Sequence, residues 1–198
     1  MNLPNKITVT RLVLAPFFFA AFFLSDLFPN INPVLYAVII GLLYFVMELT
    51  DLLDGMAARR NNLVTDLGKV IDPFADVMCH LTFFTCLLYA GIMPVWAFVL
   101  IMWREFAQSF TRMLMMGKGK ALAANIFGKA KTCLYAVTCI LGFVLRFCMV
   151  AAIDFEFISA FRTVLTALFG LAAFASVASY LIYVKGIMDS KVLNDMTR

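Results

Sequence analysis

The chain has 198 residues, of which 64% are hydrophobic and 14% are charged, and its mean hydropathy is +0.95. A composition this apolar excludes an ordinary soluble domain and predicts a polytopic membrane protein. The net charge of +4 comes from basic residues spread among loops without a long basic tract, which argues against a nucleic-acid partner.

Six transmembrane helices are predicted, with a short interfacial segment at the N-terminus. The segment MNLPNKITVTR carries Lys6 and Arg11, which suit the headgroup level. The apolar run that follows is long enough for a first span from Val9 to Phe28. Further helices are expected at 33–59, from 68 to about 89, at 95–116, at about 127–150 and at about 157–188. No internal repeat is visible, so we expect residues 1–198 to form a single all-α domain.

The distribution of Lys and Arg predicts the orientation. With six spans and both termini on one side, only Arg146 and Arg162 of the sixteen Lys and Arg residues lie on the opposite side. Cytoplasmic loops of membrane proteins carry the excess of positive charge, so the termini are expected in the cytoplasm. The absence of a targeting signal suits a bacterial inner membrane.

Four carboxylates gather near the cytoplasmic ends of the second and third predicted helices. Asp51 and Asp54 are three residues apart and share a helix face, and Asp72 and Asp76, four residues apart, share a face of the next helix. Charge is costly within a membrane, so we expect the two faces to converge on cations. An all-oxygen set without His or Cys favours two Mg²⁺ or Mn²⁺ ions over zinc.

Two glycines and an arginine accompany the carboxylates. Gly55 and Gly68 leave the helix surface without side chains, so the phosphates or base of a ligand can approach the backbone. Arg59 follows Gly55 by one helical turn. It can offer a bidentate donor to a diphosphate held by the metals.

The segment from Asp51 to Asp76 resembles the signature of the CDP-alcohol phosphotransferases, a family of membrane enzymes, at every fixed position: Asp51-x2-Asp54-Gly55-x2-Ala58-Arg59-x8-Gly68-x3-Asp72-x3-Asp76. The resemblance implies transfer of a phosphate-linked group from a cytidine diphosphate donor to an alcohol, with release of CMP. It implies a homodimer and a general-base role for Asp76 beside its role as a metal ligand. The implied CDP-binding residues are Asp51, Gly55, Arg59 and Gly68.

A second polar cluster lies on the fourth predicted helix and the start of the fifth. Arg104 and Arg112 fall within a span, and Lys129 and Lys131 follow on the cytoplasmic side. A basic pocket beside the metal site favours an acceptor that already carries phosphate, such as glycerol 3-phosphate. Loop charges that only set the topology remain the alternative for the two lysines.

Three segments are also similar to phosphatidylglycerophosphate synthases within the family. The similarity implies CDP-diacylglycerol as the donor, glycerol 3-phosphate as the acceptor and a place in phospholipid biosynthesis. Those synthases usually have Lys directly after the fourth Asp, where this chain has Val77, so the acceptor stays open. Besides the aspartate segment, the similar stretches are Pro4-Asn5-x2-Thr8-x2-Arg11-x4-Pro16, Arg104-Glu105-x6-Arg112 and Gly128-Lys129-x-Lys131-Thr132.

Other functions fit part of the pattern. Within the family, the acceptor could be inositol phosphate, serine or a second lipid, or CDP-choline could react with diacylglycerol. A basic pocket disfavours the uncharged alcohols. Outside the family, a divalent-cation transporter would use the acids as its ion site, but such sites typically lie near the membrane midplane between repeated halves.

His80 carries a weaker signal than the aspartates. It follows Asp76 by one helical turn. A lone His in this position is more typical of a packed or hydrogen-bonded residue than of a catalytic one.

Overall fold

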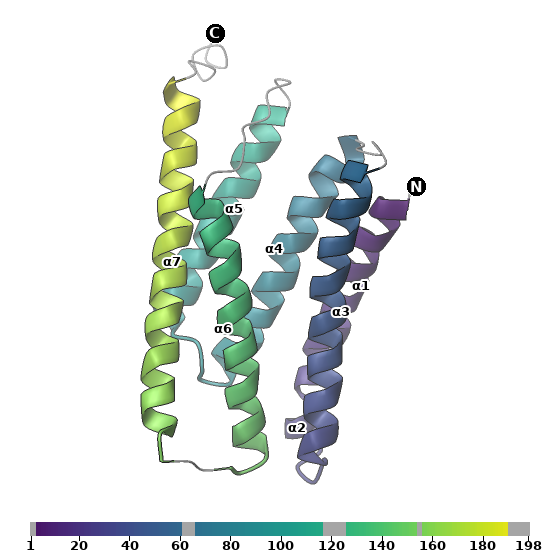
Figure 1. Cartoon of the computed structure of the whole chain (residues 1–198), viewed down its shortest axis with the longest axis vertical. Helices are drawn as coiled ribbons and strands as arrows, with labels where there is room; N and C mark the ends of the chain where they lie inside the picture. Colours follow the sequence, from purple (N-terminus) through teal and green to yellow (C-terminus); the bar gives the residue numbers. More distant parts are fainter. Residues whose placement is uncertain (1–2, 61–65, 117–125, 154–155, 190–198) are drawn as a thin grey trace.

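The computed structural model describes residues 3–60, 66–116, 126–153 and 156–189, and these residues are helical apart from short turns. They contain no strand, which confirms the all-α class. Figure 1 shows the helices as one elongated bundle. In chain order they are α1 Leu3–Phe22, α2 Leu24–Leu27, α3 Pro33–Arg60, α4 Asp66–Tyr89, α5 Val95–Met116, α6 Ile126–Val150 and α7 Ile158–Asp189.

The described helices include five stretches that are long and apolar enough to cross a membrane: Asn5–Leu27, Pro33–Asp51, Val70–Tyr89, Ala130–Val150 and Ile158–Met188. The remaining long helix, α5, has 22 residues. It is less apolar than the others because it carries Arg104, Glu105 and Arg112. The protein is therefore a polytopic integral membrane protein, and the six predicted spans correspond to the six long helices among the described residues.

Local chemistry explains where the helices begin and end. The Asn32 side chain accepts hydrogen bonds from the backbone N–H groups of Val34 and Leu35, at 2.9 and 3.3 Å, and so caps α3, which opens with Pro33. After α4, Gly91 has a φ of +67°, a left-handed conformation that favours glycine. Pro33 and Gly91 can be recognised as such signals in the sequence. α3 and α5 match the predicted ranges 33–59 and 95–116 closely.

The N-terminal segment differs from the expected interfacial segment. Leu3–Phe22 forms one continuous helix instead of a surface segment followed by a span that begins at Val9. The reason is a polar stripe on α1, because Asn5, Thr8 and Arg11 are all buried in the bundle. The segment therefore packs against other helices through these three residues.

Two groups of helices make up the bundle. α1 packs against α3 and α4, whereas α7 packs against α6 and α5 (Figure 1). α4 joins the groups through its contacts with α5 and α6, and α3 also contacts α6. Aromatic rings fill the core, with the Phe83 ring centroid of α4 4.7 Å from that of Phe18 on α1 and 6.1 Å from that of Phe143 on α6. The C-terminal end of α3, the start of α1 and the end of α7 lie at one end of this bundle.

Candidate active site

The predicted carboxylates lie where α3 ends and α4 begins, at the end of the bundle that also holds the start of α1 (Figure 1). The structure describes the side chains of Asp51, Asp72 and Asp76. Asp54, Gly55 and Arg59 lie on the described backbone of α3, but the side chains of Asp54 and Arg59 lie outside the described part of the structure. Gly68 is buried on α4.

Helix α1 contacts both helices that carry the carboxylates. Oγ1 of Thr8 donates a hydrogen bond of 2.5 Å to Oδ1 of Asp72 on α4. Three residues along the same face of α1, Nη1 of Arg11 donates to Oδ1 of Asp51 on α3. One face of α1 therefore connects α3 to α4 through their carboxylates.

Sequence reasoning had assigned Thr8 and Arg11 no role in this site. We expected Arg11 at the headgroup level, but its side chain is only 2% exposed and is paired with Asp51. The spacing of Asn5, Thr8 and Arg11 was the available signal, because polar residues that recur every three positions form one stripe along a helix. A buried stripe of this kind needs polar partners.

Asp76 is held by His80, one turn farther along α4. Nδ1 of His80 lies 3.1 Å from Oδ1 of Asp76 and 2.9 Å from the Asp76 backbone oxygen. Both of these oxygens accept hydrogen bonds, so Nδ1 carries the hydrogen. On the other side of the ring, Nε2 lies 3.9 Å from Oε1 of Glu48 on α3. His80 is thus both packed and hydrogen-bonded, as its position predicted.

Glu105 is the centre of a second cluster, between α5, α6 and α7. Its Oε2 accepts a hydrogen bond of 2.9 Å from Nη1 of Arg104. Its Oε1 accepts a hydrogen bond of 2.8 Å from Nζ of Lys131 and one of 2.9 Å from the Tyr135 hydroxyl. All four side chains are buried. Arg104 also donates from Nε to the backbone oxygen of Ser176 on α7, at 3.0 Å.

This cluster brings together two of the four residues predicted to bind the acceptor phosphate. Arg104 and Lys131 meet at Glu105, and two cations against one carboxylate leave one net positive charge among these three residues. Arg112 is exposed, farther along α5. The side chain of Lys129 lies outside the described part of the structure. The sequence analysis gave Glu105 no role of its own, whereas in the structure it is the carboxylate that both cations share.

Tyr135 of α6 connects the two clusters. Its ring centroid lies 5.4 Å from that of His80, and its hydroxyl contacts Glu105. The hydroxyl also lies 2.8 Å from Oγ of Ser176. Tyr135 therefore lies between His80, which holds Asp76, and the basic cluster, as we call Arg104, Glu105 and Lys131.

Comparison with known proteins identifies the family. Residues 1–178 match the family model described as CDP-alcohol phosphatidyltransferase. The chain belongs to the CDP-alcohol phosphatidyltransferase family. This confirms the family that the aspartate signature indicated.

Several bacterial proteins are similar to this member of the family. A Treponema pallidum protein named CDP-diacylglycerol–glycerol-3-phosphate 3-phosphatidyltransferase is 39% identical over 140 residues, which cover 68% of this chain and 65% of that protein, just under two thirds of its length. A Bacillus subtilis protein of the same name is 38% identical, with coverage of 66% and 70%. A Mycobacterium tuberculosis protein named probable phosphatidylglycerophosphate synthase is 31% identical, with coverage of 69% and 63%.

The carboxylates of this family member have the chemistry of a site for hard cations. Among the described side chains, no group of three His, Cys, Asp or Glu residues converges on a point that could hold a metal ion. Asp54, the fourth predicted ligand, lies outside the described side chains. The donor set is nevertheless all oxygen, and the Arg11 guanidinium paired with Asp51 shows that this site attracts positive charge.

Proposed function

We propose that this protein transfers the phosphatidyl group of CDP-diacylglycerol to glycerol 3-phosphate and releases phosphatidylglycerophosphate and CMP. The names of the relatives support this donor and this acceptor. The structural observation that carries the proposal is the position of Tyr135, which contacts His80 beside Asp76 and Glu105 in the basic cluster. Asp76, which is suited to deprotonating a hydroxyl, thus lies near Arg104 and Lys131, which are suited to binding a phosphate.

The donor side of the site consists of the aspartates and the residues around them. Two Mg²⁺ or Mn²⁺ ions held by Asp51, Asp54, Asp72 and Asp76 would neutralise the diphosphate and the leaving CMP. Gly55 and Gly68 would give the nucleotide access to the backbone, and Arg59 would donate to the diphosphate. Thr8 and Arg11 support this arrangement because they hold Asp72 and Asp51 from α1.

Asp76 serves as the general base in this proposal. It accepts the proton of the acceptor hydroxyl while that oxygen forms a bond to the phosphatidyl phosphorus and the bond from phosphorus to CMP breaks. Nδ1 of His80 lies 3.1 Å from Oδ1 of Asp76, so Oδ2 is the oxygen we assign to the hydroxyl. General-base help of this kind contributes about 10²- to 10⁴-fold in rate.

The acceptor phosphate would bind at the basic cluster. Arg104 and Lys131 exceed the charge of Glu105 by one, and this excess favours an anionic ligand. Arg112 and Lys129 would add positive charge toward the cytoplasmic end. An uncharged alcohol would gain nothing from this surplus, so a phosphorylated acceptor is favoured.

We also infer a homodimer in a bacterial inner membrane, with the site facing the cytoplasm. The distribution of Lys and Arg supports this orientation. Apolar side chains on the outer face of α5, such as Trp103 and Phe110, are exposed and suit contact with lipid or with a second copy.

An acceptor panel tests the proposal. Purified protein in detergent with Mg²⁺ would receive CDP-diacylglycerol and, in separate reactions, glycerol 3-phosphate, glycerol, serine or inositol phosphate. We expect CMP release with glycerol 3-phosphate and little with glycerol, which lacks only the phosphate. If CMP is released faster with serine or glycerol than with glycerol 3-phosphate, the role of the basic cluster is contradicted. If it is released faster with inositol phosphate than with glycerol 3-phosphate, inositol phosphate becomes the acceptor.

A further inference from the structure

Glu48 is a carboxylate that the proposed chemistry leaves without a role. It lies on α3 within the apolar stretch Pro33–Asp51. Asp51 follows it by three residues on the same helix face, so Glu48 lies about 4.5 Å farther from the end of the bundle that holds the aspartates. The side chain is 32% exposed. An ionisable side chain inside such a stretch is costly unless a polar group faces it, so Glu48 needs a partner.

The imidazole of His80 on α4 faces Glu48. Nε2 of His80 lies 3.9 Å from Oε1 of Glu48. His80 is 7% exposed, and within the part of the chain that the structure describes no atom forms a hydrogen bond with this nitrogen. Buried polar atoms in proteins are almost always hydrogen-bonded. Glu48 and Nε2 of His80 therefore each require a partner, and each lies beside the other.

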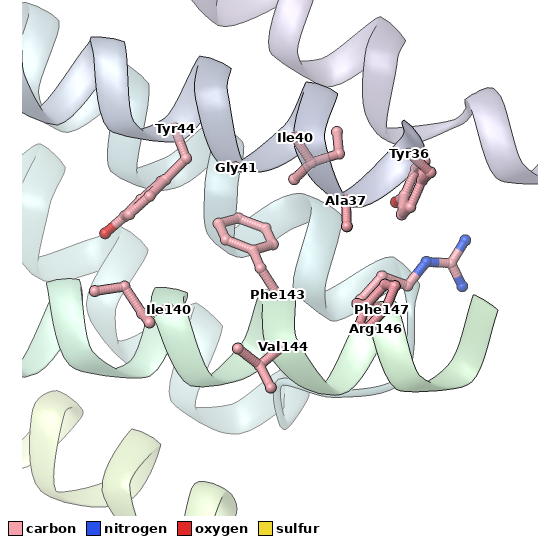
Figure 2. Close-up of a pocket in the computed structure, with 10 residues that line it drawn as sticks. All are labelled: Tyr36, Ala37, Ile40, Gly41, Tyr44, Ile140, Phe143, Val144, Arg146 and Phe147. Carbon is pink, nitrogen blue, oxygen red and sulfur yellow. The ribbon is translucent and has the colours of Figure 1, made fainter. Parts of the chain in front are cut away.

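An aromatic layer lies next to this pair, on the side away from the aspartates. Tyr44 lies one turn before Glu48 on α3, and Phe83 lies one turn after His80 on α4. The ring centroids of Tyr44 and Phe83 are 5.1 Å apart, and that of Phe143 on α6 is 5.4 Å from that of Tyr44. Figure 2 shows Tyr44 and Phe143 between α3 and α6. Such apolar surroundings strengthen a polar contact because they lower the local dielectric constant.

The contact between Glu48 and His80 needs only a small movement to become a hydrogen bond. Hydrogen bonds between nitrogen and oxygen span about 2.7–3.2 Å, and rotation of the Glu48 side chain can shorten the present distance to this range. Contacts in active sites are often long without substrate and shorten in the complex. One hydrogen between Nε2 and Oε1 completes the bond, whichever of the two atoms carries it.

We propose that Glu48 is a positioning residue that acts on Asp76 through His80. Glu48 holds Nε2, and the ring then keeps Nδ1 directed at Oδ1 of Asp76, 3.1 Å away. A partner at one nitrogen of a histidine fixes the orientation of the ring and so the contact made by the other nitrogen. Oδ2 of Asp76 keeps its direction toward the acceptor hydroxyl. The inference rests on the proposed function, because that function makes Asp76 the general base.

The contact itself can be measured without any enzyme assay. His80 is the only histidine of the sequence, so protein that is labelled with ¹⁵N-histidine and purified without a histidine tag gives NMR signals from one imidazole. The spectra are recorded in detergent without metal or substrate. We expect Glu48→Leu to shift the Nε2 signal, and to shift it more than the Nδ1 signal, because Nε2 loses its partner.

Asp26→Asn is the matched control for this measurement. Asp26 is also a partly exposed carboxylate, with 36% of its side chain exposed, and it also pairs with a basic residue, Arg146, at 2.7 Å. It lies on α2, at the opposite end of the bundle from the aspartates (Figure 1). Asp26→Asn should therefore leave both imidazole signals unchanged.

Turnover tests the consequence of the contact. We expect Glu48→Leu to lower kcat for CMP release by about tenfold, the lower end of the range for residues that support a ligand or base. KM for CDP-diacylglycerol and the Mg²⁺ concentration for half-maximal rate should hardly change. Glu48→Gln keeps a polar group that can bind Nε2 and should recover most of the loss. Asp26→Asn should keep kcat.

A double variant distinguishes a role through His80 from any other role of Glu48. If Glu48 acts through His80, its substitution costs nothing more once the imidazole is gone. Glu48→Leu/His80→Leu should then be as slow as His80→Leu alone. A further tenfold loss in the double variant, as expected if Glu48 binds a metal ion or only supports the fold, would overturn the inference.

The outcomes separate this inference from the proposed function. An Nε2 signal that is the same in Glu48→Leu and in the unsubstituted protein would show that Glu48 does not hold His80, however fast the enzyme turns over. If Glu48→Leu does not fold, Glu48→Asp withdraws the carboxylate by one methylene group and gives the same comparisons. No CMP release by the unsubstituted protein with any donor or acceptor would instead contradict the proposed function, and the NMR spectra would still decide whether Glu48 holds His80.

Discussion

Oγ1 of Thr8 donates a hydrogen bond of 2.5 Å to Oδ1 of Asp72, a residue 64 positions away in the sequence. This bond places the first helix in the candidate active site. Because Arg11 pairs with Asp51 from the same face of α1, a single helix sets the positions of carboxylates on both α3 and α4. The site therefore depends on three helices, not on the two that carry its aspartates.

Loss of the Thr8 hydroxyl is expected to weaken metal binding. Thr8→Val keeps the shape of the side chain but removes the donor to Asp72. Partners of metal ligands typically contribute about 10- to 100-fold to metal affinity or activity, so the Mg²⁺ concentration for half-maximal CMP release should rise by about tenfold or more. Thr8→Ser keeps a hydroxyl and serves as the control. A normal Mg²⁺ requirement in Thr8→Val would show that the bond to Asp72 has no role in the site.

The hydrogen bond from His80 to Asp76 is expected to support turnover. His80→Leu removes it, and kcat should fall by about 10- to 100-fold, with little change in KM for the donor. His80→Asn places an amide N–H near the position of Nδ1 and should recover much of the loss. If the Asn variant is as slow as the Leu variant, the hydrogen bond is not the feature that matters.

Glu105 is expected to stabilise the fold because it balances two buried cations. Glu105→Gln leaves Arg104 and Lys131 without their carboxylate, and breaking a buried ion pair typically costs about 3–5 kcal/mol. Thermal unfolding in detergent should show a clear fall in Tm. The double variant Glu105→Gln/Lys131→Met should lose less than the sum of the two single variants, because the pair is removed together. Additive losses would contradict a shared ion pair.

Lys131 is expected to affect the acceptor and not the donor. Lys131→Met removes a positive charge from the basic cluster, and KM for glycerol 3-phosphate should rise by about tenfold or more, since hydrogen bonds to charged groups are worth about 1.5–3 kcal/mol. KM for CDP-diacylglycerol should hardly change. Lys185→Met, at an exposed position of α7, is the matched control. An equal rise of KM for both substrates would place Lys131 outside the acceptor site.

The helices were largely predictable because local signals determine their ends. Pro33 and Gly91 mark the start of α3 and the turn after α4, and α5 runs from Val95 to Met116 as predicted. The placement of the aspartates at one end of the bundle also followed from helical spacing. Such signals act within one or two helical turns, so they predict the ends of a helix but not its contacts with other helices.

Contacts between distant helices were not predictable in this way. Thr8 meets Asp72, and Lys131 meets Glu105, only because the helices pack in one particular arrangement. The spacing of Asn5, Thr8 and Arg11 is visible in the sequence, but we expected this segment at the headgroup level, and the spacing does not name the partners of these residues. The sequence likewise showed two cations at Arg104 and Lys131 but not the carboxylate that they share.

The most direct test of the central claim is CMP release from CDP-diacylglycerol on addition of glycerol 3-phosphate, measured for the unsubstituted protein and for Asp76→Asn. The unsubstituted protein should release CMP with Mg²⁺, stop when a chelator is added and recover when Mg²⁺ is restored. Asp76→Asn should lose about 10²- to 10⁴-fold in rate while it still binds CDP. Normal turnover by Asp76→Asn, or turnover that a chelator leaves unchanged, would contradict catalysis by the carboxylates of α3 and α4.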